Sequence, residues 1–377
     1  MEILKEVSRL RIVNPFPPEP GVFITIKAIR MNTQQRIEQA RKTLGQDLVI
    51  FGHHYQNDAV IRHADHTGDS LELARKSGNS TAKHIVFCGV HFMGESAALL
   101  AEPGQNVYLP EPKADCVMAR MAPAALLDRI MTALTADGRK VIPLTYVNSS
   151  LAVKAVCGKY GGSVCTSSNG ETMLAWARTQ GDAVLFVPDH KLGRNMARRL
   201  GIPETEQLIL NISKNGRLVE ELQNAGRLNQ ARLLLWPGCC AIHARFHVEH
   251  IDAVRKNAPD VQVLVHPECS PEVVAAADFA GSTSAIIKYV EEARRGSVIA
   301  IGTEINLVRR LSHRYAGEKE IFPVLDSACS DMAKVTEEKL AALLEDIVNG
   351  RACPLQIDQT QADHARRALR TMLEVCS

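Results

Sequence analysis

One pattern of apolar and polar residues occurs three times in this chain. An apolar run ends in an aromatic residue or a histidine, and a second polar side chain follows two positions later. The three copies are VIFGHHYQ (49–56), VIPLTYVN (141–148) and VQVLVHPE (261–268). Such a repeat indicates one supersecondary unit used three times, so we expect equivalent residues of the copies to occupy equivalent places.

Each copy continues in the same way. A turn rich in hydroxyl side chains follows, and the three turns are GDS (68–70), CTSS (165–168) and GSTS (281–284). A second apolar run comes next, in HIVFCGVHFMGES (84–96), DAVLFVPDHKLGRN (182–195) and SVIAIGTEINLV (297–308). A third apolar run then leads to a cysteine, which is Cys116, Cys240 or Cys329. The repeat therefore predicts that three matching cysteines face one point.

The apolar runs predict the fold class. They are rich in Val, Ile and Leu and do not alternate with polar residues, which is typical of buried parallel strands. Stretches with helical character, such as TQQRIEQARKTL (33–44) and SPEVVAAADFA (270–280), lie between them. Strands that alternate with helices predict an α/β fold with parallel sheets and right-handed crossovers.

Ligands of such sheets bind at the carboxyl ends of the strands. The polar residues that follow the first run of each copy are His53 and Tyr55, Tyr146 and Asn148, and His266 and Glu268. Any one of them alone could be a loop residue that caps a strand. The recurrence of titratable side chains at one offset favours a shared binding site.

The near-zero net charge gives no indication that the protein binds nucleic acid or membranes. The chain has 377 residues, enough for two or three domains, and a formal net charge of +2. No apolar stretch is long enough to cross a bilayer, and the first residues do not resemble a secretory signal. We therefore expect a cytoplasmic protein in which residues 1–34 form an N-terminal arm.

The ten cysteines suggest a reducing compartment and a metal site. Cys88 lies inside an apolar run and is expected to pack in the core. Cys116, Cys240 and Cys329 are far apart in the sequence, and only the repeat brings them together. Three thiolates are one short of a closed zinc or iron–sulfur site, which leaves an open position for a Lewis acid. The residues themselves leave zinc and an iron–sulfur cluster both open.

A second zinc site is conceivable in the segment CCAIHARFHVEH (239–250). It would use His243, His247 and His250, of which the first two are one helical turn apart. No general base of the H-E-x-x-H kind accompanies them. We expect these histidines to form mostly a polar helix face, with His243 close to Cys240.

The repeats resemble the quinolinate synthase family, the enzymes of de novo NAD biosynthesis. The matching segments are GHHYQ, GDSLELA, the isolated Cys116, TYVNSS, CTSSN, PDHKLGRN, PGCCAIHARF, HPECSPEVV, GSTSAIIKYV and CSDM, which together span about 50 to 332. The resemblance implies three similar Rossmann-like, three-layer α/β domains with parallel sheets around a pseudo-threefold axis. It also implies one 4Fe-4S cluster per chain, held by Cys116, Cys240 and Cys329.

The expected domains follow the repeats. The first consists of 35–115 with the C-terminal helices of 330–377. The second is 116–239, with insertions near 158–163 and 199–232, and the third is 240–329.

The resemblance implies a reaction as well. Iminoaspartate and dihydroxyacetone phosphate condense to quinolinate, phosphate and water are released, and the cluster acts as a Lewis acid. The implied pocket residues are His53, Tyr55, Ser70, Tyr146, Asn148, Ser167, His266, Glu268, Ser282 and Thr283. Glu268 is the expected general base or acid, Tyr146 and His53 are expected proton donors, and Tyr55 has either a catalytic or a positioning role. A transient contact with L-aspartate oxidase is possible.

Two other classes compete with this interpretation. One is a zinc-dependent lyase or hydrolase that uses the same three cysteines. The other is a non-catalytic α/β protein that binds nucleotides, although the sequence contains neither G-x-G-x-x-G after a strand nor a P-loop motif.

Overall fold

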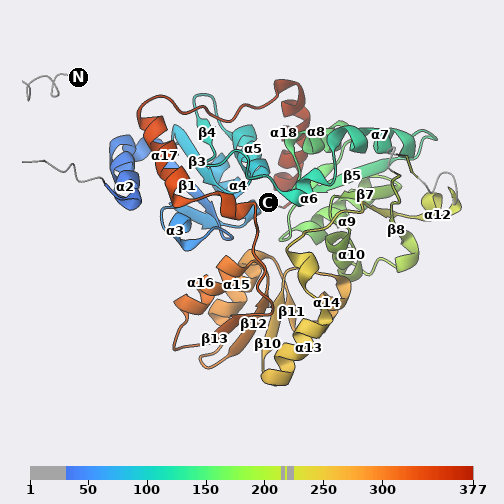
Figure 1. The fold of residues 1–377 in the computed structure, drawn as a ribbon. Helices are drawn as coiled ribbons and strands as arrows, with labels where there is room; N and C mark the ends of the chain where they lie inside the picture. Colours follow the sequence, from blue (N-terminus) through green and yellow to red (C-terminus); the bar gives the residue numbers. More distant parts are fainter. Residues whose placement is uncertain (1–30, 214–216, 219–224, 377) are drawn as a thin grey trace, which may run out of the picture. The chain divides into compact units, whose positions relative to one another are not determined.

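Three separate parallel sheets form the framework of the chain (Figure 1). The computed structural model describes residues 31–213, 217–218 and 225–376. Residues Thr33–Ser377 form one compact unit. The predicted N-terminal arm lies outside the described residues up to position 30, and α2 begins at Thr33.

The three sheets share one strand order. The first has the order β2-β1-β3-β4, the third β11-β10-β12-β13, and the second β6-β5-β7-β9, with β8 added at its edge. Every strand pair in them is parallel. The predicted α/β class with three similar parallel-sheet units is therefore confirmed, whereas the pseudo-threefold axis stays a prediction.

The nine apolar runs of the repeat all form strands. In the first sheet they are β1 (Leu48–His53), β3 (His84–Cys88) and β4 (Asn106–Tyr108). In the second they are β5 (Val141–Tyr146), β7 (Ala183–Val187) and β9 (Leu233–Leu235), and in the third β10 (Gln262–Val265), β12 (Val298–Gly302) and β13 (Glu320–Pro323). Every residue of β1, β5 and β7 is buried, because helices cover both faces of a parallel sheet.

Each sheet also contains a short strand that the apolar pattern did not predict. These strands are β2 (His66–Gly68), β6 (Ser163–Cys165) and β11 (Phe279–Ala280). Their register pairs His53 with Gly68, Tyr146 with Cys165, and Val265 with Ala280. Each hydroxyl-rich turn therefore begins beside the carboxyl end of the first strand of its copy.

Helices connect the strands. Those of the first two copies are α3 (Asp58–Ile61), α4 (Ser70–Gly78), α5 (His91–Leu100), α6 (Val117–Arg120), α7 (Ala124–Leu134), α8 (Leu151–Lys159), α9 (Gly170–Gln180), α10 (His190–Arg199) and α12 (Ala225–Gln230). Those of the third are α13 (Val248–Asn257), α14 (Pro271–Ala276), α15 (Thr283–Glu292) and α16 (Ile305–Arg314). Short 3-10 turns occur at Gly45–Asp47, Glu204–Glu206, His243–Arg245 and Met332–Lys334.

The two segments proposed as insertions have different structures. Residues 158–163 are the end of α8, the following turn and the first residue of β6. Within 199–232, β8 (Gln207–Ile209) extends the second sheet beside β9, while 214–216 and 219–224 lie outside the described residues.

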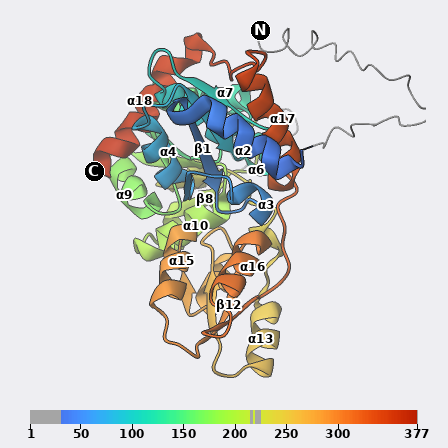
Figure 2. The same cartoon turned by 90° about the vertical axis from the view of Figure 1, so that its left-hand side faces the viewer.

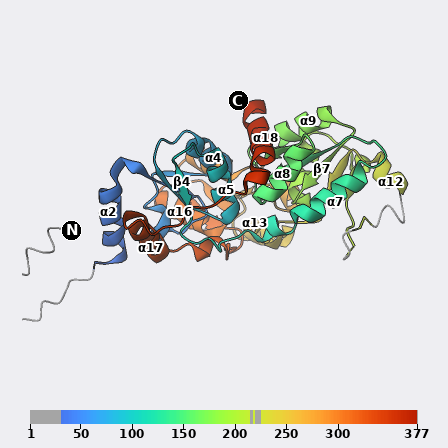
Figure 3. The same ribbon diagram turned by 90° about the horizontal axis from the view of Figure 1, so that it is seen from above.

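The last two helices pack against different copies of the repeat. The helix α17 (Glu337–Val348) lies beside α2 (Thr33–Leu44), and Arg36 bonds Glu345 there (Figure 2). The last helix, α18 (Gln359–Val375), packs on α8 and β6 of the second copy (Figure 3). A Cβ atom at Gly158 would lie 1.9 Å from the carbonyl oxygen of His364, so glycine permits this close approach. The domain boundaries drawn from the sequence remain a proposal.

Candidate active site

The carboxyl ends of all three sheets contribute to one pocket. The polar residues expected there lie in its wall: His53 and Tyr55 after β1, Tyr146 and Asn148 after β5, and His266 and Glu268 after β10. Ser70, Ser167 and Thr283 of the hydroxyl-rich turns line it too. The structure thus brings together residues that are far apart in the sequence.

The three repeat cysteines line the same pocket. Cys116, Cys240 and Cys329 follow the strands β4, β9 and β13. In each case the cysteine carbonyl accepts a hydrogen bond from the N–H four residues later, at Arg120 (3.3 Å), Ala244 (2.9 Å) and Ala333 (3.0 Å). All three cysteines therefore begin a helical turn, although only the first of these turns continues as an α-helix.

This turn directs backbone N–H groups toward the sulfur atoms. The N–H groups of Ala119, His243 and Met332, each three positions after its cysteine, act to lower the pKa of the thiol. Burial nevertheless raises the pKa of Cys116 to about 12 and raises the pKa values of Cys240 and Cys329. The residues that line the pocket, all within the described part of the chain, include no lysine or arginine. Bound metal would supply the positive charge that thiolates need here, so the donor set fits a metal centre.

One close group of potential metal ligands lies in the wall of the same pocket. Among the described residues, the group whose ligand atoms all lie within 4.8 Å of one another is Cys240, His243 and Glu268. The other two cysteines do not join that group.

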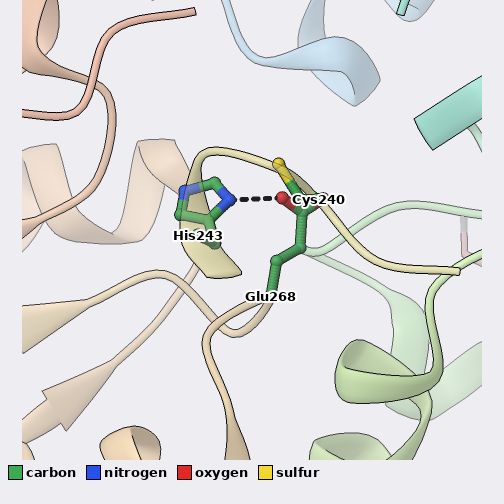
Figure 4. Close-up of side chains that lie close together, drawn as sticks. All are labelled: Cys240, His243 and Glu268. Atoms are coloured by element: carbon green, nitrogen blue, oxygen red, sulfur yellow. Dashed lines mark hydrogen bonds and ion pairs between the residues drawn. The ribbon is translucent and has the colours of Figure 1, made fainter. Parts of the chain in front are cut away.

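Glu268 begins a chain of hydrogen bonds between buried side chains, and Figure 4 shows its first bond, to His243. Its Oε2 is 2.5 Å from Nδ1 of His243, and Nε2 of His243 is 3.1 Å from Oγ1 of Thr303. The hydroxyl of Tyr55 lies 2.9 Å from the same Thr303 oxygen and accepts a 3.2 Å hydrogen bond from Thr283. The network joins the first and third copies of the repeat.

The carboxylate of Glu268 retains a free acceptor. Burial favours its neutral form, but the adjacent His243 holds the pKa of Glu268 below its usual value. Its Oε1 is buried and accepts no hydrogen bond from the described residues by distance and angle, while the hydroxyl of Tyr146 lies close to the carboxylate. An ionised, desolvated acceptor beside a tyrosine is suited to proton transfer.

His53 and His266 can each donate a hydrogen bond from Nε2, because Nδ1 of each ring is an acceptor. Nδ1 of His53 accepts the N–H of Tyr55 at 3.1 Å, and Nδ1 of His266 accepts the N–H of Glu268 at 3.3 Å. Burial lowers the pKa of each histidine to about 3, so both rings are neutral near pH 7. A neutral ring whose Nδ1 accepts carries its proton on Nε2.

The three hydroxyl-rich turns meet at Asp69. Its Oδ2 accepts hydrogen bonds from Ser168 and Ser284, both at 2.9 Å. These serines belong to the second and third copies, and Asp69 to the first. One carboxylate therefore ties the three turns together at the edge of the pocket.

Ser282 is the predicted pocket residue that does not line the pocket. Its hydroxyl accepts the N–H of Ala285 and caps α15, with 5% of the residue exposed. Thr283, the next residue, points into the pocket instead. The sequence did not distinguish the two because both are small hydroxyl residues in one turn.

The expectation of a shared helix face for His243 and His247 was wrong. His243 lies in a 3-10 turn (His243–Arg245), and α13 begins only at Val248. The chain is extended at Phe246, whose ring is buried in the core of the third sheet and so interrupts the helix. His243 is buried in the pocket wall and lies close to Cys240, as expected. His247 instead donates its backbone N–H to Nδ1 of His250.

The sequence did not single out Asp69 or Thr303 as residues of this site. Asp69 lies inside a hydroxyl-rich turn, so the repeat itself marked its neighbourhood. Thr303 follows β12 and had no counterpart in the other copies that would have singled it out.

Comparisons with known proteins show the family to which the chain belongs. Residues 35–374 match the family described as Quinolinate synthetase A protein. The chain is 45% identical over 347 residues to the quinolinate synthase of Streptomyces coelicolor, covering 90% of this chain and 87% of that one. It is 43% identical over 348 residues to that of Acidobacterium capsulatum, with 90% and 92% covered. It is 40% identical over 379 residues to that of Bacillus mycoides, with 99% and 100% covered. The chain therefore belongs to the quinolinate synthase family of enzymes.

Proposed function

We propose that this enzyme condenses iminoaspartate with dihydroxyacetone phosphate to quinolinate, releasing phosphate and water, as a step of NAD biosynthesis. The observation that carries the proposal is the convergence of Cys116, Cys240 and Cys329 with Glu268 in one buried pocket. Membership of the family supports the reaction.

Cys116, Cys240 and Cys329 would hold one 4Fe-4S cluster. The bound cluster would supply a Lewis-acidic iron without a protein ligand, which favours the departure of hydroxyl groups from the substrate. Support comes from the helical turn that begins at each cysteine and from the N–H groups in it that favour the thiolate form.

Glu268 would act as the general base that removes protons from carbon as the ring forms. Its ionised state, its burial and its free Oε1 support this role. Tyr146 is the proposed proton donor closest to Glu268. Burial, and then the charge of Glu268, raise the pKa of Tyr146 well above its usual value, so its proton is retained until a developing oxyanion takes it.

His53 and His266 would donate from Nε2 to oxygen atoms of the substrates, and His53 would also hand a proton to a leaving oxygen. Tyr55, fixed by Thr283 and Thr303, would orient the substrate or assist proton transfer. Asn148 would accept a hydrogen bond from a hydroxyl or N–H group of a substrate. Its Oδ1 is buried and has no hydrogen-bond partner among the described residues.

The hydroxyl-rich turns would bind the phosphate of the triose. Ser70 and Thr283 are the first residues of α4 and α15, and Ser167 lies in the turn before α9. Backbone N–H groups at helix N-termini attract anions. The pocket offers these groups in place of an arginine clamp. Ser282 would contribute by holding the start of α15.

A zinc-dependent lyase or hydrolase that uses the same cysteines remains the alternative. The observation in favour of zinc is that one of these cysteines, Cys240, has ligand atoms of His243 and Glu268 within 4.8 Å. A transient contact with L-aspartate oxidase and a cytoplasmic location stay predictions. Among the described residues, no helix combines the length and apolar character that a membrane crossing requires.

Anaerobic purification followed by iron, sulfide and zinc analysis tests the proposal. We expect iron and acid-labile sulfide in equal amounts in the wild type and their loss in Cys116→Ser, Cys240→Ser and Cys329→Ser. Cys239→Ser, Cys88→Ser, Cys353→Ser and Cys376→Ser are the matched controls and should retain both. Zinc without sulfide would favour the alternative, and loss of iron from Cys239→Ser but not Cys240→Ser would contradict the choice of ligand.

A further inference from the structure

Asp189 and Glu304 occupy the same place in two copies of the repeat. Each lies two residues beyond the second apolar strand of its copy, after β7 and β12. Each caps the helix that follows. Oδ1 of Asp189 accepts the N–H groups of Lys191 (2.8 Å) and Leu192 (3.1 Å), and Oε2 of Glu304 accepts that of Asn306 (2.8 Å).

The second oxygen of each carboxylate binds a repeat cysteine. Oδ2 of Asp189 accepts the N–H of Cys240 at 3.2 Å, and Oε1 of Glu304 accepts the N–H of Cys329 at 3.3 Å. Both acids have no exposed surface. Each carboxylate thus joins a helix start on one loop to a cysteine on another loop, and it needs both oxygens to do so.

The first copy differs at this position. Val90 stands two residues beyond β3, and it caps α5 without a side-chain hydrogen bond. A backbone bond ties the helix start to the cysteine loop in all three copies: the N–H of His91, His190 and Ile305 donates to the carbonyl of Ala114 (2.7 Å), Gly238 (3.0 Å) and Ser327 (2.9 Å). In the second and third copies Asp189 and Glu304 add a bond to the cysteine N–H itself. Helix capping alone therefore does not demand a buried acid here, because an apolar residue serves in the first copy.

A buried carboxylate is a costly choice for a cap. Serine, threonine or asparagine cap helices with a single acceptor, and several do so elsewhere in this chain. Burying an ionisable group is unfavourable unless its hydrogen bonds are satisfied. The feature that separates Asp189 and Glu304 from the other caps is the bond to a pocket cysteine.

We propose that Asp189 and Glu304 are positioning residues that hold the backbone of Cys240 and Cys329 so that the two sulfur atoms face the bound cluster. This inference rests on the proposed function, because it assigns the two cysteines to the cluster. Mutation of a residue that hydrogen-bonds to a metal ligand and orients it lowers metal affinity by about 10-fold to 100-fold.

Asp189→Asn and Glu304→Gln test the inference. Each amide keeps its shape and one acceptor oxygen for the helix cap, but its NH₂ group opposes the cysteine N–H. Each anaerobically reconstituted variant should release iron to a chelator about 10 to 100 times faster than the wild type. The visible absorption spectrum of the cluster should change as well. In cluster-free protein, hydrogen exchange of the peptide that contains Cys240 or Cys329 should accelerate.

Asp358→Asn is the matched control. Asp358 caps α18 in the same way, by accepting the N–H of Thr360 at 2.9 Å, and no bond joins it to a repeat cysteine. It should leave iron release and the spectrum unchanged. Iron release and peptide exchange at the wild-type rate in both Asp189→Asn and Glu304→Gln would overturn the inference. If one of them fails to fold, the other decides. A wild type that binds no iron and sulfide would contradict the proposed function instead, and the exchange measurement would still test the two bonds.

Discussion

The carboxylate of Glu268 and the imidazole of His243 form a buried pair, with Oε2 and Nδ1 2.5 Å apart. Glu268 follows β10, whereas His243 lies in the turn that begins at Cys240, so the pair connects the proposed base to the loop of a proposed cluster ligand. A substitution of either residue is therefore expected to disturb the position of the other.

Glu268→Gln should yield a folded enzyme with little activity. The amide keeps the size of the side chain but cannot act as a base, and general acid–base groups contribute about 10²-fold to 10⁴-fold to turnover. The measurement is turnover together with iron content. Glu272→Gln, an exposed change on the nearby helix α14, is the control. Wild-type turnover in Glu268→Gln would mean that Glu268 only holds His243.

Thr283→Ala and Ser282→Ala should have different effects. Thr283 lines the pocket, so its alanine variant should raise the half-saturating concentration of dihydroxyacetone phosphate more than that of iminoaspartate. Ser282 caps α15, and its loss should cost about 1 kcal/mol of folding free energy. Inorganic phosphate should compete with the triose phosphate and lose potency in the double variant. Unchanged phosphate inhibition in a destabilised double variant would leave both residues with a structural role only.

Asp69 should be coupled energetically to Ser284. A hydrogen bond to a charged group contributes about 1.5 to 3 kcal/mol, so Ser284→Ala should lower the free energy of unfolding measurably. In an Asp69→Ala background the same change should cost much less, as a double-mutant cycle in urea would reveal. Ser168→Ala, which removes the other serine bond to Asp69, should behave alike. Equal costs in both backgrounds would show that the contact carries no stability.

Lys154 should make stability depend on alkaline pH. The side chain is fully buried, with Nζ 2.5 Å from the carbonyl of Ser149, and burial lowers the pKa of Lys154 from 10.5 to about 8. Above pH 8 the folded state loses this proton while the unfolded state keeps it to about pH 10.5, so this group's contribution to stability rises with pH in that window.

The comparison of wild type with Lys154→Met isolates this effect, since all other groups are shared. The wild type should gain about 2 kcal/mol relative to the variant between pH 7 and pH 9.5, measured by urea unfolding at each pH. If the difference in unfolding free energy between wild type and Lys154→Met stays constant across this range, the pKa of Lys154 is not lowered in the folded protein.

Much of the framework follows from local sequence. Nine apolar runs are strands, and α2 coincides with the stretch 33–44, because continuous apolar runs and helical periodicity report how one segment is buried. The three cysteines line one pocket with equivalent turns because equivalent segments of a repeat adopt equivalent structures. Cys88 is buried in β3, as its apolar neighbours indicated.

Other features depend on neighbours that the local sequence does not identify. The strands β2, β6 and β11 are two or three residues long and exist only through pairing with a longer strand. The end of the 3-10 turn after His243 depends on the burial of Phe246, and the position of α18 depends on the space that Gly158 leaves.

The sequence by itself determined the α/β class, the threefold use of one unit and the residue types at the strand ends. Only the tertiary structure decided which of these residues meet. The bonds from His243 to Thr303, from Asp69 to Ser284 and from Glu304 to Cys329 join separate segments of the chain. A segment's own pattern reports whether it is buried, but not what it is buried against, because that depends on the packing of the remaining chain.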